Sequence, residues 1–258
     1  MTTQPPSFVD WMLGLPVLPL GALVVGVWVA VALLVDWAIV PWLAGPGGRK
    51  LGRFEPEVAS QLGLVFGLLL SFNAVTIWEQ SSTAREAVLA EASALREIAD
   101  LSSEFSTERR RDVNVQLQAY LRHLIETEWP RLASGNVPLD RPVPLRALSS
   151  VIRSGNNEEL RSSLATAMEA RETRIRIAGY RMLPARWSLV LVLGALTVLA
   201  VGLVHAEHRR ARTIAVGLVS FGIACCFLVL FLHARPFLGV LALKPAELSA
   251  LAAELRGP

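Results

Sequence analysis

The residues whose types and spacing suggest chemistry lie in one apolar segment, residues 58–78. Small residues recur there every four positions, at Gly63, Gly67 and Ser71, and this spacing lets another helix approach closely. Other side chains recur at helical spacing on a different face of the same segment. They are Phe66, Asn73, Thr76 and Gln80.

Asn73 lies within the apolar run, where an amide without a hydrogen-bond partner is costly. It either bonds a neighbouring helix, which is the structural interpretation, or faces water. If several copies of the segment surround an axis, Phe66 forms an apolar constriction, with a polar ring of Asn73 and Thr76 above it. Such a constriction beside a polar ring is a usual way to gate ions.

A second group of candidates is the arginine-rich stretch 169–186. Its arginines either attract anions toward a membrane mouth or form the salt-bridged end of a helix, with Glu169 and Glu172 as partners. Both interpretations stay open. The anion-attracting candidates are Arg174, Arg181 and Arg186.

Other chemistry has little support. His205 and His208 lie one turn apart beside Glu207, but a metal site needs further ligands, so we expect no metal and no cofactor. Cys225 and Cys226 are adjacent within an apolar run and form no redox motif. The sequence carries no phosphate loop and no catalytic motif, so we expect no enzyme. Its arginines are interleaved with acids, which argues against nucleic-acid binding.

The elements that position these residues follow from hydropathy. Of the 258 residues 53% are hydrophobic and only 18% are charged, and the charges avoid four long apolar segments. About 20 apolar residues are enough to span a bilayer as a helix. We therefore predict a multi-pass integral membrane protein with four spans. They are residues 17–35, 58–78, 187–204 and 214–232.

The remaining residues also read as helices, so the predicted fold class is all-α. No proline or glycine occurs between the end of span two and Phe105, so residues 58–105 are predicted to form one helix of about 70 Å. Further helices are expected at 107–132, 142–152, 158–180 and 245–255, with a turn and cap at Gly155-Asn156. The predicted domains are 1–78 with spans one and two, 79–185 as an extramembrane helical domain, 186–234 with spans three and four, and 235–258 as a C-terminal segment with a short amphipathic helix.

The loop charges predict an orientation. The loop after span one carries Arg49, Lys50 and Arg53. The loop after span three carries Arg209, Arg210 and Arg212. The positive-inside rule places both loops in the cytoplasm and the helical domain outside.

Six stretches spread over nearly the whole chain resemble the bacterial bestrophin-like domain family of four-span proteins. The resemblance is carried by their order and spacing. They are Gly63 to Phe72 (GLVFGLLLSF), Glu91 to Arg96 (EASALR), Glu128 to Pro130 (EWP), Arg171 to Arg174 (RETR), Leu183 to Trp187 (LPARW) and Arg235 to Gly239 (RPFLG).

A more distant resemblance to bestrophin anion channels implies an oligomer whose second span lines the pore, with Phe66, Leu70 and Asn73 as pore residues. It also implies that the helical domain lies in the cytoplasm, opposite to the loop-charge expectation. Two departures from the bestrophin pattern are that Asn73 follows Phe72 in place of an arginine, and that no acidic cluster follows span four, which puts calcium gating in doubt.

Two functions therefore stand side by side. The first is an oligomeric channel of the bacterial cytoplasmic membrane that passes small inorganic anions through second spans around an axis, with membrane lipid and further copies of the chain as partners. The second is a non-conducting scaffold, sensor or regulator that presents its helical domain to a partner. An axial path open at both ends would favour the first.

Overall fold

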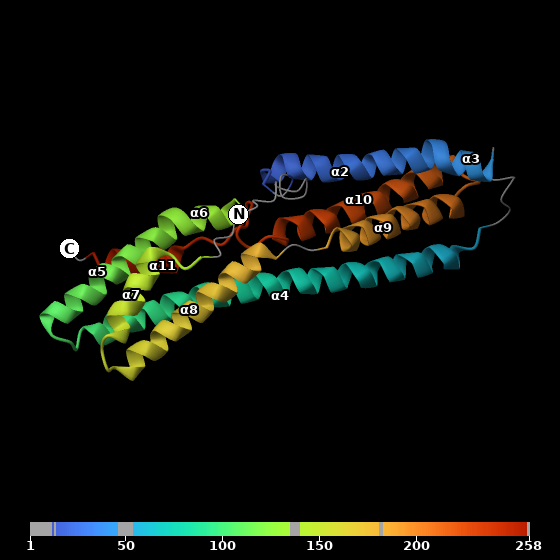
Figure 1. Cartoon of the computed structure of the whole chain (residues 1–258). Coiled ribbons are helices and arrows are strands. Elements are labelled where there is room, and N and C mark those ends of the chain that lie inside the picture. Colours follow the sequence, from blue (N-terminus) through green and yellow to red (C-terminus); the bar gives the residue numbers. More distant parts are fainter. Residues whose placement is uncertain (1–11, 13, 46–53, 135–139, 181–182, 257–258) are drawn as a thin grey trace. The chain divides into compact units, whose positions relative to one another are not determined.

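The computed structural model describes residues 12, 14–45, 54–134, 140–180 and 183–256, and its regular elements are all helices (Figure 1). The described part of the chain contains no strand, which confirms the all-α prediction. In chain order the helices are α2 (Val17–Leu34), η1 (Val35–Ile39), α3 (Val40–Ala44), α4 (Pro56–Ser102), α5 (Thr107–His123), η3 (Leu124–Glu128), α6 (Trp129–Ala133), α7 (Val143–Arg153), α8 (Glu158–Gly179), α9 (Pro184–Val204), α10 (Arg209–His233) and α11 (Ala246–Glu254).

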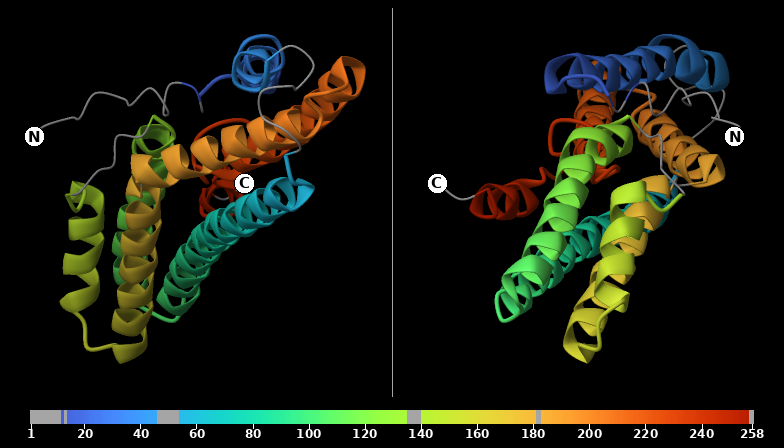
Figure 2. Two further views of the ribbon diagram at one scale, coloured as in Figure 1. Left: turned by 90° about the vertical axis from the view of Figure 1, so that its right-hand side faces the viewer. Right: turned by 60° about the vertical axis from the view of Figure 1, so that its left-hand side comes forward.

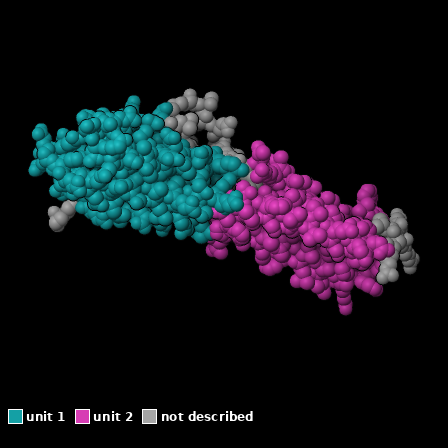
Figure 3. Space-filling view, turned by 90° about the horizontal axis from the view of Figure 1, so that it is seen from below, with its two compact units in different colours: residues 1–14, 79–180, 235–258 teal, residues 15–78, 181–234 magenta. Residues whose placement is uncertain are grey.

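The chain divides into two compact units, which Figure 3 shows in different colours. The membrane unit contains residues 15–78 and 181–234. The helical unit contains residues 79–180 and 235–258, together with the N-terminal residues 1–14. The C-terminal segment thus packs with the helices that lie between spans two and three.

In the described part of the chain, four helices are long and apolar enough to cross a membrane, which confirms the predicted spans. They are Val17–Ala44, Pro56–Ser102, Pro184–Val204 and Arg209–His233. The second continues without a break far beyond its apolar part. Its 47 residues correspond to a length of about 70 Å, in agreement with the single long helix expected from the sequence.

The membrane unit is held together around α10, which packs against both α2 and α9 (Figure 1). Trp28 of α2 lies over Phe227 of α10, with ring centroids 5.5 Å apart. Gly194 of α9 permits this approach, because a Cβ there would lie 2.7 Å from Trp28 Cη2 and 3.2 Å from Phe66 Cε2. Glycine is thus the residue that fits at this crossing of helices.

The helical unit is built on α5, which packs against α7 and α11, while α7 also lies beside α8 (Figure 2). Its core includes Leu95 and Ile98 of α4 together with Leu117 and Leu121 of α5, all fully buried. The turn at Gly155 precedes α8 as expected. The cap residue is Asn157 rather than Asn156, because the Asn157 Oδ1 accepts a hydrogen bond from the Leu160 amide at 2.9 Å.

Two π-helical segments, η1 and η3, each come just before a proline, Pro41 and Pro130. Proline lacks an amide hydrogen, and its ring clashes with the carbonyl four residues earlier in a regular helix. One wider turn relieves this clash and lets the helix continue. Each wider turn also carries one buried carboxylate, Asp36 in η1 and Glu128 in η3.

Candidate functional site

The predicted pore residues lie on α4, but they do not share one environment. Phe66 is buried against Gly194 of α9 within the same chain. Leu70 and Asn73 are half-buried. The Asn73 Nδ2 donates to the Leu69 carbonyl of its own helix at 3.0 Å. Among the described residues the hydrogen bond from Asn73 to another helix, expected on the structural interpretation, is therefore not formed.

Two hydroxyls in the apolar part of α4 also bond only within their own helix. The Thr76 hydroxyl donates to the Phe72 carbonyl at 3.0 Å, and the Ser71 hydroxyl donates to the Gly67 carbonyl at 2.8 Å. Gln80 is half-buried. The span thus keeps its hydroxyls satisfied without help from another helix of the chain.

The small residues of α4 have few neighbours within the chain. A Cβ on Gly63 would come no closer than 3.9 Å to Thr197, and a Cβ on Gly67 would meet nothing within 4 Å. Ser71 is exposed. The close helix approach predicted for this ladder is therefore not made at Gly67 by any described part of the same chain.

One face of α4 is exposed along its whole length. Only 6% of the residues in its most apolar stretch are buried, against 33% in α9 and in α10. Exposed side chains recur on this face every three or four residues, which places them in one line. We call this set the outer stripe: Leu64, Leu68, Ser71, Val75, Glu79, Ser82 and Glu86.

The arginine candidates have different environments. Arg186 is exposed at the start of α9. Arg181 lies outside the described residues. Arg174 is fully buried, and its charge is balanced by Glu91 and Glu128 rather than by the expected Glu169 and Glu172. Arg174 therefore presents no free charge to an ion in solution, which agrees with the salt-bridge interpretation although its partners are others.

Arg174 is the centre of a buried cluster of charges in the helical unit. Its Nε donates to Glu91 Oε2 at 2.7 Å, and its Nη2 donates to Glu128 Oε1 at 2.6 Å. Arg171 Nη2 donates to Glu128 Oε2 at 2.8 Å. The Tyr120 hydroxyl donates to Glu91 Oε1 at 2.6 Å. Two carboxylates thus face two guanidinium groups, and their charges balance; we call these five residues the charge cluster.

Aromatic side chains cover the charge cluster. The Arg174 guanidinium carbon lies 5.4 Å from the ring centroid of Trp129, which fits a cation–π contact. Trp129 donates from Nε1 to the Leu243 carbonyl at 3.2 Å and meets the Phe237 ring edge-on at 5.6 Å. Residues from four of the six stretches that carry the family resemblance therefore meet in one place.

The charge cluster shifts two pKa values. Burial and the neighbouring Glu91 carboxylate raise the pKa of Tyr120 well above its usual value. Burial alone would raise the pKa of Glu128, but Arg174 and Arg171 outweigh it and lower that pKa. A carboxyl group whose pKa is lower in the folded than in the unfolded protein stabilises the fold at pH values above its unfolded-state pKa. The stability that Glu128 contributes is therefore lost as the pH falls through its lowered pKa.

Tyr120 gives a pH-dependent prediction with a matched control. A raised pKa means that its stabilising effect is present below about pH 10, the usual tyrosine value, and is lost as the pH rises further. Tyr120→Phe should lower the free energy of unfolding by about 1.5–3 kcal/mol at neutral pH, because a hydrogen bond to a charged acceptor disappears. It should also flatten the alkaline loss of stability in thermal melts.

The control for this prediction is Tyr180→Phe, which changes the only other tyrosine, 40% exposed. It should leave the melting curve unchanged at neutral pH. Equal effects of the two substitutions would contradict a special role for Tyr120.

The membrane unit also contains a buried ion pair, which the sequence did not predict. Arg212 Nε donates to Asp36 Oδ1 at 2.6 Å, and Arg212 Nη2 donates to the Asp36 carbonyl at 3.1 Å. The Thr213 hydroxyl lies 2.8 Å from Asp36 Oδ2. Asp36 follows the last residue of predicted span one, and Arg212 is one of the charges assigned to the loop after span three. A charge inside an apolar helix is a signal that could have found them.

Metal binding is not indicated by the described residues, in which no group of three or more His, Cys, Asp and Glu side chains could hold an ion. His205 bonds the Val201 carbonyl of its own helix at 3.0 Å, and His208 is exposed. Cys225 and Cys226 are free thiols on α10.

The four apolar helices and the helical unit define a multi-pass membrane protein of the all-α class. Within that class, the model of the Bestrophin-like domain matches residues 26–248, so the chain belongs to the bestrophin-like domain family. A comparison with curated proteins and with solved structures gives no match.

Proposed function

We propose that the protein is an oligomeric ion channel of the bacterial cytoplasmic membrane, with its second span around a central pore and no enzymatic activity. Family membership supports a channel. The observation that carries the proposal is the exposed face of α4, because an apolar helix with so little burial in its own chain is suited to meet further copies.

We propose that the pore is lined by the part of the outer stripe that belongs to the membrane unit, Leu64, Leu68, Ser71 and Val75. Phe66 is buried within its own chain, so the proposal adds the exposed stripe to the pore candidates Leu70, Asn73, Thr76 and Gln80. Leu64 and Leu68 would form an apolar constriction that gates by excluding water. Ser71 follows one turn later and supplies a hydroxyl.

Small anions are the proposed permeant ions, on the strength of the resemblance to bestrophin channels. The carboxylates of Glu79 and Glu86 belong to the same stripe, and rings of carboxylates favour cations. The test must therefore measure both signs of ion. Anions pass if these acids point away from the axis in the oligomer, and cations pass if they ring it.

The test is ion flux from liposomes that contain the purified full-length protein, with chloride and potassium measured separately. Leu68→Asn should raise the flux about tenfold or more, because a polar side chain wets an apolar constriction. The matched control is Leu196→Asn on α9, which is also an exposed leucine of a span and should leave the flux unchanged. Phe66→Ala and Asn73→Ala complete the series as tests of the other face.

Each outcome decides between functions. Chloride flux that responds to Leu68→Asn and not to Leu196→Asn supports the proposed anion channel. If potassium flux is observed and it falls in Glu79→Gln, the same pore conducts cations rather than anions. No flux from inserted, oligomeric protein contradicts a channel and favours the non-conducting scaffold that presents the helical unit to a partner.

A further inference from the structure

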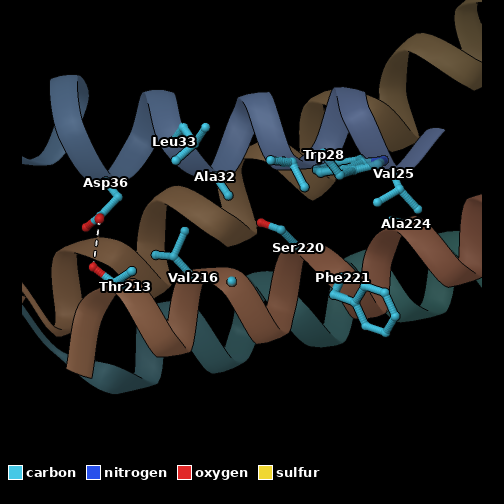
Figure 4. A pocket seen from close by; sticks show the side chains of 12 residues that line it. Val25, Trp28, Ala32, Leu33, Asp36, Thr213, Val216, Ser220, Phe221 and Ala224 are labelled. Carbon is cyan, nitrogen blue, oxygen red and sulfur yellow. Dashed lines mark hydrogen bonds between the residues drawn. The ribbon is translucent and has the colours of Figure 1, made fainter. Parts of the chain in front are cut away.

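A groove lies between α2 and α10 in the membrane unit (Figure 4). Its volume is about 190 Å³, and its lining is almost wholly apolar. Trp28 and Phe221 provide aromatic surface. Gly217 lines the groove on α10 and leaves space there. The exposed side chains of Val29, Leu33 and Phe221 border it, so a ligand dissolved in the bilayer can enter from the side.

Ser220 is the exception among the hydroxyls of the spans. It is 2% exposed and its Oγ has no hydrogen-bond partner. By contrast, Ser188 and Thr197 of α9 each donate to the carbonyl four residues earlier. Figure 4 shows the Ser220 hydroxyl pointing toward α2, into the groove. A buried hydroxyl without a partner is unfavourable, so this orientation indicates a ligand that carries an acceptor.

Water does not fit this position well, because a buried water needs two to four polar partners. The other polar groups that line the groove are the side chains of Asp36 and Thr213, which already bind each other, and the indole N–H of Trp28. Thr213 lies seven residues from Ser220, about 10 Å along the helix. The groove therefore favours a mostly apolar molecule with one oxygen at the level of Ser220.

The depth of Ser220 restricts the source of that oxygen. Arg209 and Arg210 are exposed at the start of α10, which marks the membrane surface. Ser220 follows eleven residues later, about 16 Å along the helix, and the hydrocarbon layer is about 30 Å thick. The hydroxyl thus lies near the middle of the bilayer, deeper than the ester groups of phospholipids.

We propose that the groove binds the ring of a membrane-dissolved quinone, with one ring carbonyl accepting a hydrogen bond from Ser220 Oγ. A flat carbonyl-bearing ring matches the aromatic faces of Trp28 and Phe221 and the volume of the groove. The inference concerns binding alone. It involves α2 and α10 and not the face of α4, so it does not depend on the proposed channel.

The experiment is a titration of the full-length protein in phospholipid nanodiscs with a short-chain 1,4-benzoquinone. The readout is the saturable part of the quenching of tryptophan fluorescence, since Trp28 lines the groove. Ser220→Ala should raise the dissociation constant about tenfold, the effect of one lost hydrogen bond. An alkylbenzene with the same chain but no carbonyl should bind at least about tenfold more weakly, for the same reason.

Two glycines supply a blocking variant and its control. A Cβ on Gly217 or on Gly26 would meet nothing within 4 Å, so neither Gly→Leu substitution clashes at its base. Gly217 lines the groove and Gly26 does not. Gly217→Leu should abolish saturable quenching, and Gly26→Leu should leave it unchanged. Thermal melts identify any variant that fails to fold.

Three results would overturn the proposal. They are quenching by the quinone that never saturates, an unchanged dissociation constant in folded Ser220→Ala, and equal binding of the alkylbenzene. The last result would assign the groove to lipid acyl chains. Ser188→Ala serves as the control for removing a hydroxyl that already has a partner.

Discussion

Arg174→Met is expected to destabilise the protein by about 3–5 kcal/mol. The substitution leaves two buried carboxylates, Glu91 and Glu128, with a single remaining cation, Arg171, which binds Glu128. Methionine keeps most of the length of the side chain, so the lost charge dominates the effect. For a chain of this size the thermal midpoint should fall by roughly 6–20 °C. The fluorescence of Trp129, which lies over the guanidinium, should report the same transition.

Arg141→Met is the matched control. Arg141 pairs with Glu172 at 3.2 Å, but both side chains are more than half exposed. Solvent screens such a pair, so its removal should cost no more than about 1 kcal/mol. Replacing Glu91 alone by glutamine in the Arg174→Met background should recover part of the loss, because Glu128 keeps its pair with Arg171. Equal losses of stability in Arg174→Met and Arg141→Met would contradict a larger contribution of the charge cluster than of an exposed ion pair.

Asp36→Ala should have a comparable effect in the membrane unit. It leaves the Arg212 guanidinium buried without its carboxylate, at a cost of about 3–5 kcal/mol. It also removes the acceptor of the Thr213 hydroxyl, although that hydroxyl keeps the Arg209 carbonyl at 3.0 Å. Thermal melts in nanodiscs should therefore show a fall of several degrees or more.

Two further variants separate the causes of that fall. Asp100→Ala removes an exposed aspartate and should leave the midpoint nearly unchanged. Asp36→Ala combined with Arg212→Met should be more stable than Asp36→Ala alone, because no unpaired charge remains. A double variant as unstable as the sum of its parts would contradict a direct pairing of Asp36 with Arg212.

Two of the buried carboxylates share a local design. Each lies in a wider helical turn that precedes a proline, Asp36 before Pro41 and Glu128 before Pro130. The proline forces the wider turn, and the turn changes the direction in which the acid points. The backbone irregularity and the buried charge are thus two results of one sequence feature.

The sequence alone determined the elements of this protein. Four uninterrupted apolar runs are long enough to cross a bilayer, and no other structure satisfies the backbone there. The absence of proline and glycine after span two likewise predicted one long helix, and Gly155 predicted the turn before α8 to within one residue of its cap. These features depend on neighbours in the chain, so periodicity and local propensity are sufficient to predict them.

Only the tertiary structure decided which charges meet. Glu91 and Arg174 are 83 positions apart and Asp36 and Arg212 are 176 apart, so no local pattern links them. The sequence therefore left Arg174 open between an anion-attracting charge and a salt bridge to Glu169 and Glu172, and it gave no partner for Asp36. The same holds for α4, where Phe66 and Asn73 share helical spacing, but Phe66 is buried, Asn73 is half-buried and the outer stripe is exposed. Helical spacing groups residues on one face, but the packing of distant helices determines which face is buried.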